Sequence, residues 1–352
     1  MGTLVEATVC FGPNASGEAA AATQEQLAGA LRRLIGEIEQ ELSRFQDDSD
    51  VAQLVRAYGA WTPVGTHTAV VLRRAIALRE ATDGLFDPAP PGRLIAVRPS
   101  PPTSPPGGAH RYEARLDGTD QHDPQYSPTG PPGGAHHYEA RLGGTDQHDP
   151  RHSPTGPPGG AHRYEARLGG IDRRDSSAWG LAGEAPGAEP PLLDLGAIGK
   201  GYAADQALRL CLDLGATSAL VAVGVSSIAA AAPRDHRPWR IGIRSPGAAR
   251  DEALGVLEVH LGGVAASSTD EQPGHVRDPR TLRAPADEVA QATVVAGSAL
   301  VADAVSTALL VGGTALAARL AHRLPEAQTI LVTKDSVLVS PALRASFRPT
   351  YR

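Results

Sequence analysis

Apolar residues near the N-terminus repeat with the spacing of two amphipathic helices. A capping box at 23–26 begins the first, which we expect to continue to about residue 46 as a wall of the core. The second is expected from about Thr68 to Glu80, ending near Gly84, because glycine suits a helix C-terminus. Residues 3–11 alternate as a strand does. The apolar positions of the first helix are Leu27, Leu31, Leu34, Ile35, Ile38, Leu42 and Phe45.

Strand and helix patterns alternate again in the C-terminal part of the chain. Residues 193–201 predict a strand end and a glycine-rich loop, and 202–214 predict a helix. Further strands are expected over 218–225, 239–244, 254–264, 293–296, 329–333 and 336–340, and further helices over 298–311 and 316–324. Because hairpins occur among these strands, the expected fold class is α/β (α+β) with a mixed sheet, not a doubly wound parallel sheet.

A repetitive segment separates these two parts. Three near-copies with a period of 26 residues begin at Pro105, Pro131 and Pro157, each opening with Pro-Pro-Gly-Gly-Ala-His. Seven of the 12 histidines fall in this segment, so weak metal capture is one interpretation, and duplication of a surface loop is the one we favour. The copies lack the apolar content of a packed solenoid, so we expect a disordered insert. The sequence thus predicts one domain formed by 1–97 and 191–352, interrupted by an insert at 98–190.

Overall composition excludes several classes of protein. A formal net charge of −6 argues against a nucleic acid or an anionic membrane as partner. The two cysteines, Cys10 and Cys211, lack metal-ligand spacing, and we expect both to be small buried hydrophobic residues. No basic N-terminal leader precedes an apolar run, and no apolar stretch reaches about 18 residues, so we expect a cytoplasmic protein without stable membrane insertion.

Candidate chemistry begins in the glycine-rich stretch at 194–205. Glycine lets the backbone approach a ligand closely, and the N-terminus of the following helix favours an anion. We therefore expect a phosphate group as the ligand. Lys200 lies within this stretch and is one of only two lysines in the chain. The alternative is an ordinary tight turn between a strand and a helix.

Two downstream stretches point to a metal and to acid–base chemistry. Asp303 and Thr307 are four residues apart, so on a helix they share one face, and a carboxylate with a hydroxyl suits Mg²⁺. His275 lies in the stretch Gly-His-Val-Arg-Asp-Pro-Arg. Together with the lysine loop, these residues indicate chemistry on a pyrophosphate.

The motifs together resemble those of the ApbE-type FAD:protein FMN transferases. Residues 193–203 are similar to the family's Leu-Asp-Leu-Gly-Gly-Ile-Ala-Lys-Gly-Tyr-Ala, and 275–281 are similar to its His-Ile-x-Asp-Pro-Arg-Thr. Residues 302–308 match Ala-Asp-Ala-x-x-Thr-Ala, and 82–88 match Thr-Asp-Gly-x-Phe-Asp-Pro. Met-Gly-Thr at 1–3 resembles the first motif of the family. The four motifs at 82–88, 193–203, 275–281 and 302–308 occur in the family's order.

This resemblance implies an enzyme that splits the FAD pyrophosphate, passes FMN to a threonine or serine hydroxyl of a target protein and releases AMP. It places Mg²⁺ at Asp303 and Thr307, with Ser306 and the backbone of Ala197. It makes His275 the catalytic residue that deprotonates the acceptor hydroxyl or assists the leaving phosphate. It also puts Asp278 in the catalytic loop, where we expect it to cap or orient the loop. The implied FAD contacts are Gly2, Thr3, Asp83, Phe86, Asp87, Gly196, Lys200, Gly201, Asp205, Gly224 and Ser267. Phe86 stacks on the flavin in one interpretation and belongs to the core in the other. The expected assembly is a monomer or homodimer.

Several positions depart from the family pattern. Val55 stands where an asparagine is usual, Ala89 replaces a threonine, and Leu282 replaces a glycine. The family's Gly-Gly-Asp is Gly-Val-Ser at 224–226, and its Thr-Ser-Gly is Ala-Ser-Ser at 266–268. Most of these changes concern nucleotide recognition, and each lost polar contact costs on the order of 1 to 3 kcal/mol. Two alternatives therefore stay open: an FAD pyrophosphatase that forms FMN and AMP, and a non-catalytic flavin-binding protein.

Overall fold

The computed structural model describes residues 4–11, 17–58, 60–89, 178–181, 192–247, 252–269, 276–285 and 288–350. Its α-helices are α1 (Gly17–Leu42), α2 (Asp50–Arg56), α3 (Thr66–Ala81), α5 (Gly196–Asp213) and α6 (Ala299–Arg323). Its strands are β1 (Val5–Cys10), β2 (Thr62–Pro63), β3 (Ala178–Trp179), β4 (Ser218–Val223), β5 (Ser227–Ala231), β6 (Trp239–Arg244), β7 (Ala253–Val259), β8 (Leu261–Ser268), β9 (Val289–Ala296), β10 (Gln328–Thr333), β11 (Val337–Val339) and β12 (Phe347–Pro349), with a 3₁₀ turn at Pro341–Leu343.

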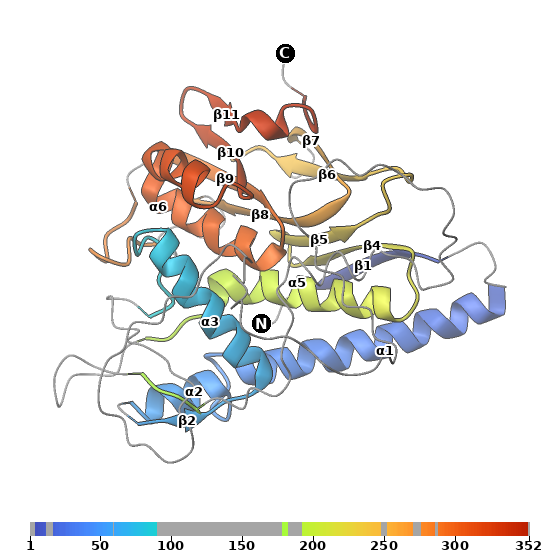
Figure 1. Cartoon of the computed structure of the whole chain (residues 1–352), viewed down its shortest axis with the longest axis horizontal. Helices are drawn as coiled ribbons and strands as arrows, with labels where there is room; N and C mark the ends of the chain where they lie inside the picture. The colour runs from blue at the N-terminus through green and yellow to red at the C-terminus, as the bar shows by residue number, and fades with distance from the viewer. Residues whose placement is uncertain are drawn as a thin grey trace, which may run out of the picture.

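A seven-stranded sheet forms the centre of the molecule (Figure 1). Its strand order is β1-β4-β5-β8-β9-β10-β11, and β12, β7 and β6 form a second sheet. The expected combination of helices and sheet in one α/β fold is confirmed. Every strand pair among the described residues is antiparallel, so the pairing is more uniform than the mixture we expected. Four of these nine pairs join strands that are consecutive along the chain with no helix described between them: β4-β5, β6-β7, β8-β9 and β10-β11.

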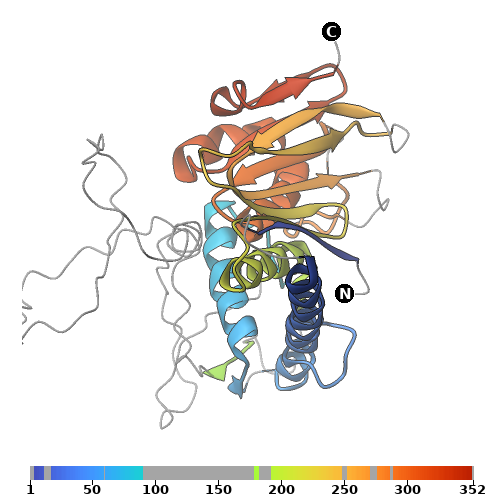
Figure 2. The same ribbon diagram turned by 90° about the vertical axis from the view of Figure 1, so that its right-hand side faces the viewer.

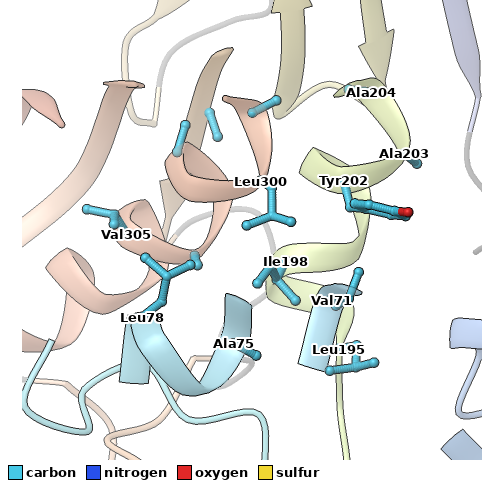
Figure 3. Packing of buried hydrophobic residues seen from close by; sticks show 14 of the residues in the cluster. Val71, Ala75, Leu78, Leu195, Ile198, Tyr202, Ala203, Ala204, Leu300 and Val305 are labelled. Atoms are coloured by element: carbon cyan, nitrogen blue, oxygen red, sulfur yellow. The ribbon is translucent and has the colours of Figure 1, made fainter. Parts of the chain in front are cut away.

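Helices cover one face of the large sheet (Figure 2). The larger apolar core lies between the sheet and α5 and α6, and α1 and α3 pack on α5 from outside. Figure 3 shows Ile198, Leu300 and Leu78 converging from α5, α6 and α3. A smaller core of Ile241, Leu257 and neighbours fills the space between the two sheets. The domain is therefore built in three layers, with the large sheet in the middle.

Close packing of α5 on α6 depends on Gly201. A methyl group added there would overlap the carbonyl oxygen of Ala299. Two buried carboxylates lock the same crossing. Asp205 of α5 accepts from the N–H groups of Ala299 (2.8 Å) and Leu300 (2.9 Å), and Asp303 of α6 accepts from the N–H of Gly201 (2.9 Å). Asp205 thus caps the first turn of α6, where N–H groups lack partners and the helix dipole favours a negative charge.

Several expected boundaries in the N-terminal part are wrong. Helix α1 begins at Gly17, so residue 23 is inside the helix and not at its start, and α1 ends at Leu42. Phe45 consequently leaves the apolar face of the helix and is 79% exposed. Helix α2 was not expected, because it is too short to show an apolar periodicity. The Ser49 hydroxyl caps it by accepting from the N–H of Ala52 (3.0 Å).

The C-terminal part differs in finer ways. The glycine-rich stretch is helical from Gly196 onward, so the expected loop is the first part of α5. The single strand expected over 254–264 is two strands, β7 and β8, which belong to different sheets. Strand β5 was not expected, since its alanines carry little strand signal. The two helices expected over 298–311 and 316–324 are confirmed, because α6 is broken between them at Gly313, which has φ 57° and ψ −154°.

A short part of the expected insert at 98–190 belongs to the fold. Residues 178–181 fall inside the expected insert but belong to the fold: β3 pairs with β2, and Trp179 and Leu181 are buried. A folded core therefore resumes before residue 190. The remaining residues of the expected insert lie outside the described residues. Cys211 is buried as expected, whereas Cys10 is exposed on the edge strand β1.

Helix α6 corrects the expectation that no apolar stretch is long enough to span a membrane. By length and composition alone its 25 residues meet that requirement, a test that core helices of soluble proteins also pass. Most of the helix is buried, with Leu309 and Val305 in the main core and Asp303 at the crossing with α5. Its apolar character is thus explained by packing inside the domain.

Replacing Gly201 with alanine should destabilise the protein by about 2 to 3 kcal/mol, because the new methyl group forces α5 and α6 apart. Gly36→Ala is the matched control, since Gly36 lies in α1 with no atom near the added methyl group, and alanine favours the helix by up to about 1 kcal/mol. Urea denaturation measures both. Equal shifts for the two variants would contradict the proposed role of the close contact.

Candidate functional site

Asp303 is the centre of the candidate site. Its side chain is buried near the start of α6, where it accepts from the N–H of Gly201. Burial raises the pKa of this carboxyl group, and Lys200, the Gly201 N–H and the neighbouring Ser227 hydroxyl oppose that rise. The Ser227 hydroxyl is buried without reaching hydrogen-bond geometry. A buried carboxylate with one nearby lysine is stabilised by a further cation.

Three hydroxyl groups lie beside Asp303 and form what we call the hydroxyl cluster: Ser267, Ser306 and Thr307. Ser267, at the end of β8, lies 2.8 Å from Ser306 and 3.3 Å from Thr307, measured between hydroxyl oxygens. The hydroxyls of Ser306 and Thr307 both donate to the carbonyl oxygen of Asp303 (2.9 and 3.3 Å). Strand β8 and helix α6 thus bring together oxygens that are 40 residues apart in the chain.

Lys200 projects from the first part of α5 on the same side as Asp303. Its ammonium group donates to the carbonyl oxygen of Gly196 (3.1 Å). Asp194 accepts from the Gly196 N–H (2.8 Å) and forms an ion pair with Arg44 (3.2 Å). The predicted residues Gly196, Lys200 and Ser267 therefore converge with the expected metal ligands.

The donor set of the site fits Mg²⁺. Asp303 supplies a carboxylate and the hydroxyl cluster supplies neutral oxygens, which are the hard ligands this ion prefers. The Gly201 N–H that donates to Asp303 lies four residues after Ala197 in α5, so the expected backbone ligand lies one helical turn from this contact. No group of three or more His, Cys, Asp or Glu occurs among the described residues, so a thiolate or histidine metal centre finds no support there.

Two predicted nucleotide contacts have structural roles. Both oxygens of Asp205 are used by α6, and the side chain is fully buried. Gly201 faces the backbone of α6, and because it has no side chain the two helices can pack closely. The sequence could not separate these roles from ligand contact, because glycine and an acidic residue near a helix N-terminus are expected for either.

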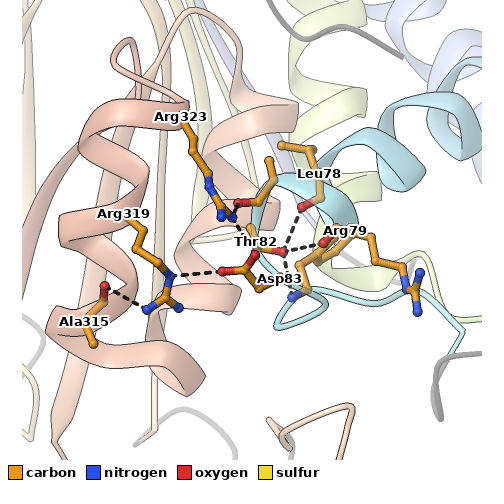
Figure 4. A network of polar contacts seen from close by, with 9 residues as sticks. Leu78, Arg79, Thr82, Asp83, Ala315, Arg319 and Arg323 are labelled. Atoms are coloured by element: carbon orange, nitrogen blue, oxygen red, sulfur yellow. Dashed lines mark hydrogen bonds and ion pairs between the residues drawn. The ribbon is translucent and has the colours of Figure 1, made fainter. Parts of the chain in front are cut away.

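The motif at 82–88 docks α3 against the end of α6 (Figure 4). Asp83 forms ion pairs with Arg319 and Arg323, and these arginines lower the pKa of its carboxyl group. Its φ of 56° is left-handed, a conformation that aspartate tolerates better than most residues. Phe86 is buried in the core, which decides between the two interpretations given above. Asp87 bonds Arg79 (2.8 Å) and the Ala89 N–H (3.0 Å), so both of its oxygens close the loop.

The loop containing Asp278 is organised by an arginine. Arg280 forms a two-pronged contact with Asp278, at 3.1 and 2.8 Å, and holds the pKa of that carboxyl group below its ordinary value. The expected orienting role of Asp278 agrees with these contacts. Leu282, at the position of the family's glycine, has φ 58° and is 48% exposed. The backbone keeps the left-handed turn although the residue there is not glycine.

Of the remaining predicted positions, the structure describes Gly224 but not the others. Gly224 has φ 63° in the turn between β4 and β5, and its N–H donates to the Leu4 carbonyl (2.8 Å), so it shapes the sheet beside Ser227. Gly2, Thr3 and the predicted base His275 lie outside the described residues. Among the departures, Val55 packs partly buried against the core and Ala89 is fully buried.

Phe45 is a candidate that sequence reasoning missed. Its ring is exposed, and the Arg44 guanidinium lies over it, 4.6 Å from the ring centre. Arg44 also forms an ion pair with Asp194, so the ring lies near the N-terminal end of α5. An exposed aromatic ring at this place suits stacking on a heterocycle. The sequence did not reveal that Phe45 is exposed, because its spacing matches the apolar face of the first helix, which we expected to include it.

Comparison with known proteins shows which family and which solved structures this chain resembles. The model of the ApbE family matches residues 1–109 and 174–331, leaving out 110–173 in the repeat segment. The FAD:protein FMN transferase of Salmonella typhimurium is 30% identical over 139 residues, which are 37% of this chain and 40% of that protein. The match therefore spans about two fifths of the curated relative.

Two solved structures share the fold. The ApbE protein of Thermotoga maritima superposes with a TM-score of 0.62 at 20% identity, covering 98% of each chain. The flavin transferase ApbE of Vibrio cholerae gives 0.62 at 19% identity, covering 98% of this chain and 96% of that one.

The metal-free protein should lose stability through Asp303 as the pH rises. Its folded pKa is raised above the unfolded value of about 3.9, so the folded state holds the proton longer, and the contribution is lost as the pH rises from about 4 through the folded pKa. Asp303→Asn should remove this loss, which is about 1.4 kcal/mol for a rise of one in the pKa. Urea denaturation at pH 5 and 7.5, with chelator, measures it. Asp235→Asn, on an exposed turn, is the control, and parallel pH profiles for wild type and Asp303→Asn would refute the effect.

Leu282→Gly should stabilise the protein by about 1 kcal/mol relative to Leu282→Ala, because only glycine adopts the left-handed conformation without strain. Both variants remove the same exposed side chain, so their difference isolates the backbone effect. Chemical denaturation of the two proteins gives the comparison. If the alanine variant were as stable as the glycine variant, the strain at this residue would be negligible.

Proposed function

The chain belongs to the ApbE family, and on this premise we propose that it is a Mg²⁺-dependent FAD:protein FMN transferase. It would transfer FMN from FAD to a threonine or serine hydroxyl of a target protein and release AMP. The curated relative from Salmonella typhimurium carries this activity in its name. The proposal extends that activity to the present chain on the basis of its own site.

One observation carries the proposal: the buried carboxylate of Asp303 lies together with Lys200 and the hydroxyl cluster. A carboxylate and three hydroxyls offer hard oxygen ligands, and the lysine adds positive charge at the same place. Phosphoryl transfer depends mainly on positioning and charge neutralisation, so this combination fits a pyrophosphate better than an uncharged substrate.

Different residues of the chain would bind the substrate and move the proton. Lys200 would bind the phosphates, and Phe45 would stack on a heterocycle of the substrate. His275 would accept the proton of the acceptor hydroxyl. The acceptor oxygen then forms a bond to the FMN phosphorus, the bond between that phosphorus and the bridging oxygen breaks, and AMP leaves with this oxygen.

Mg²⁺, when bound, would neutralise the negative charge of the pyrophosphate oxygens. Asp303, Ser306, Thr307 and the Ala197 carbonyl are the residues that would hold it. Asp303 contributes most, because its carboxylate is the only charged ligand in this set and is already desolvated.

The deciding experiment incubates the purified protein with FAD and Mg²⁺, with and without a domain that carries an acceptor threonine. Mass spectrometry of the acceptor and chromatography of the nucleotides report transfer and AMP release. Asp303→Asn should lower the transfer rate at least about 100-fold, because an amide holds Mg²⁺ poorly, and Lys200→Met should chiefly weaken FAD binding. Asp235→Asn is the control with ordinary activity.

The possible outcomes separate the alternatives. FMN and AMP without a modified acceptor would identify an FAD pyrophosphatase. FAD that binds but stays intact with both Mg²⁺ and Mn²⁺ would identify a flavin-binding protein. Transfer that Asp303→Asn leaves unchanged would show that the ligand set is misassigned.

A further inference from the structure

A fully buried hydroxyl group of the large sheet lacks a hydrogen bond. Ser227 is the first residue of β5 and is 0% exposed, and its hydroxyl oxygen is buried without a partner in the described part of the chain. Burying a hydroxyl group without a hydrogen bond costs free energy, so such groups are uncommon in folded proteins. A role other than stability would explain why a serine occupies this position.

The side chain of Ser227 points toward the helices. Side chains alternate between the two faces of a strand, and Ala229 and Ala231 of β5 belong to the main core, on the side of α5 and α6. Ser227 is two residues before Ala229, so it lies on the same face. Because alanine fills the other two positions, packing under the helices needs only a small apolar side chain on this face. The hydroxyl of Ser227 is thus an additional polar group in an apolar layer.

The same face of the neighbouring strand carries part of the hydroxyl cluster. Ser227 is paired with Ala265 of β8, and Ser267 lies two residues further along β8. A methyl group added to Gly263, on this face of β8, would overlap the backbone of Ala299, so the strand closely approaches the start of α6. The pairing of β5 with β8 therefore brings Ser227 beside the hydroxyl cluster.

Asp303 is the charged group next to the Ser227 hydroxyl. This hydroxyl helps to oppose the rise in the pKa of the carboxyl group, which is the effect of a donor near the charged form. The Gly201 N–H occupies one position on Oδ2 of Asp303 (2.9 Å). An ionised carboxylate has about four acceptor positions. The carboxylate can therefore accept from a second donor and bind a cation at the same time.

We infer that Ser227 is a positioning residue of the cation site: its hydroxyl donates to the Asp303 carboxylate when this group holds the cation, and so fixes the orientation of the ligand. Carboxylates that bind metal ions are oriented by hydrogen bonds of this kind, and losing one typically weakens metal binding roughly ten- to hundredfold. The inference rests on the proposed function, since that proposal names Mg²⁺ as the cation. It adds a residue that acts through Asp303.

Replacing Ser227 with alanine tests the inference, because it removes only the hydroxyl oxygen. Thr293→Val is the matched control, since Thr293 is also fully buried in this sheet with an unpartnered hydroxyl. Its neighbours Ala292 and Val294 belong to the main core, so Thr293 itself points away from the helices. Electron paramagnetic resonance of Mn²⁺, with and without FAD, measures metal affinity, and urea denaturation in chelator measures stability.

We expect Ser227→Ala to weaken Mn²⁺ binding about tenfold. The Mg²⁺ concentration for half-maximal FAD turnover should rise by a similar factor, while the rate at saturating Mg²⁺ stays within about twofold of wild type. The urea midpoint in chelator should stay the same or rise, because the variant removes a buried hydroxyl that has no partner. Thr293→Val should bind Mn²⁺ like wild type.

The inference and the transferase proposal can fail separately. Equal Mn²⁺ affinity of Ser227→Ala and wild type, with FMN transfer intact, would overturn the inference alone. So would weaker binding accompanied by a lower urea midpoint, or an equal loss in Thr293→Val, since the hydroxyl would then serve the fold. Wild type that binds no Mn²⁺ would overturn the inference together with the metal site. FAD that stays intact, with the tenfold loss of Mn²⁺ affinity present, would overturn the transferase proposal and support the role of Ser227.

Discussion

The crossing of α5 and α6 is the contact on which the rest of the structure depends. Each helix provides a buried carboxylate to backbone N–H groups of the other: Asp205 caps α6, and Asp303 accepts from Gly201. Gly201 makes the exchange possible, because any side chain there would separate the two backbones. Charged hydrogen bonds in a buried place are strong when both partners are fixed, and here each helix fixes the other.

This crossing also accounts for the chemistry. Holding Asp303 inside the protein next to Lys200 creates a carboxylate whose pKa is raised by burial, and the hydroxyl cluster brings neutral oxygens to the same place. A site arranged in this way is stabilised when a cation and an anionic ligand arrive together. Both Asp205 and Asp303 are buried aspartates at this crossing, but Asp205 stabilises the start of α6, whereas Asp303 is a candidate ligand for a cation.

The two halves of helix α6 carry different polar contacts. Its first half carries Asp303 and the hydroxyls, and its second half, beyond the break at Gly313, carries Arg319 and Arg323. Asp83 links the second half to α3, so the motif that contains it contributes to the shape of the molecule near the end of α6.

The sequence by itself determined the family, the α/β class and the residues of the candidate metal site, because these depend on local motifs and on spacing along one helix. Asp303 and Thr307 needed only helical periodicity to be paired. Tertiary structure alone decided that Asp205 and Gly201 serve packing, that Phe86 is core and that Phe45 is exposed, since burial depends on contacts between distant segments. It also decided the entirely antiparallel pairing of the described strands and the meeting of Ser267 with Thr307. Local sequence fixes which face of a helix is apolar, but only the packed chain determines what that face meets.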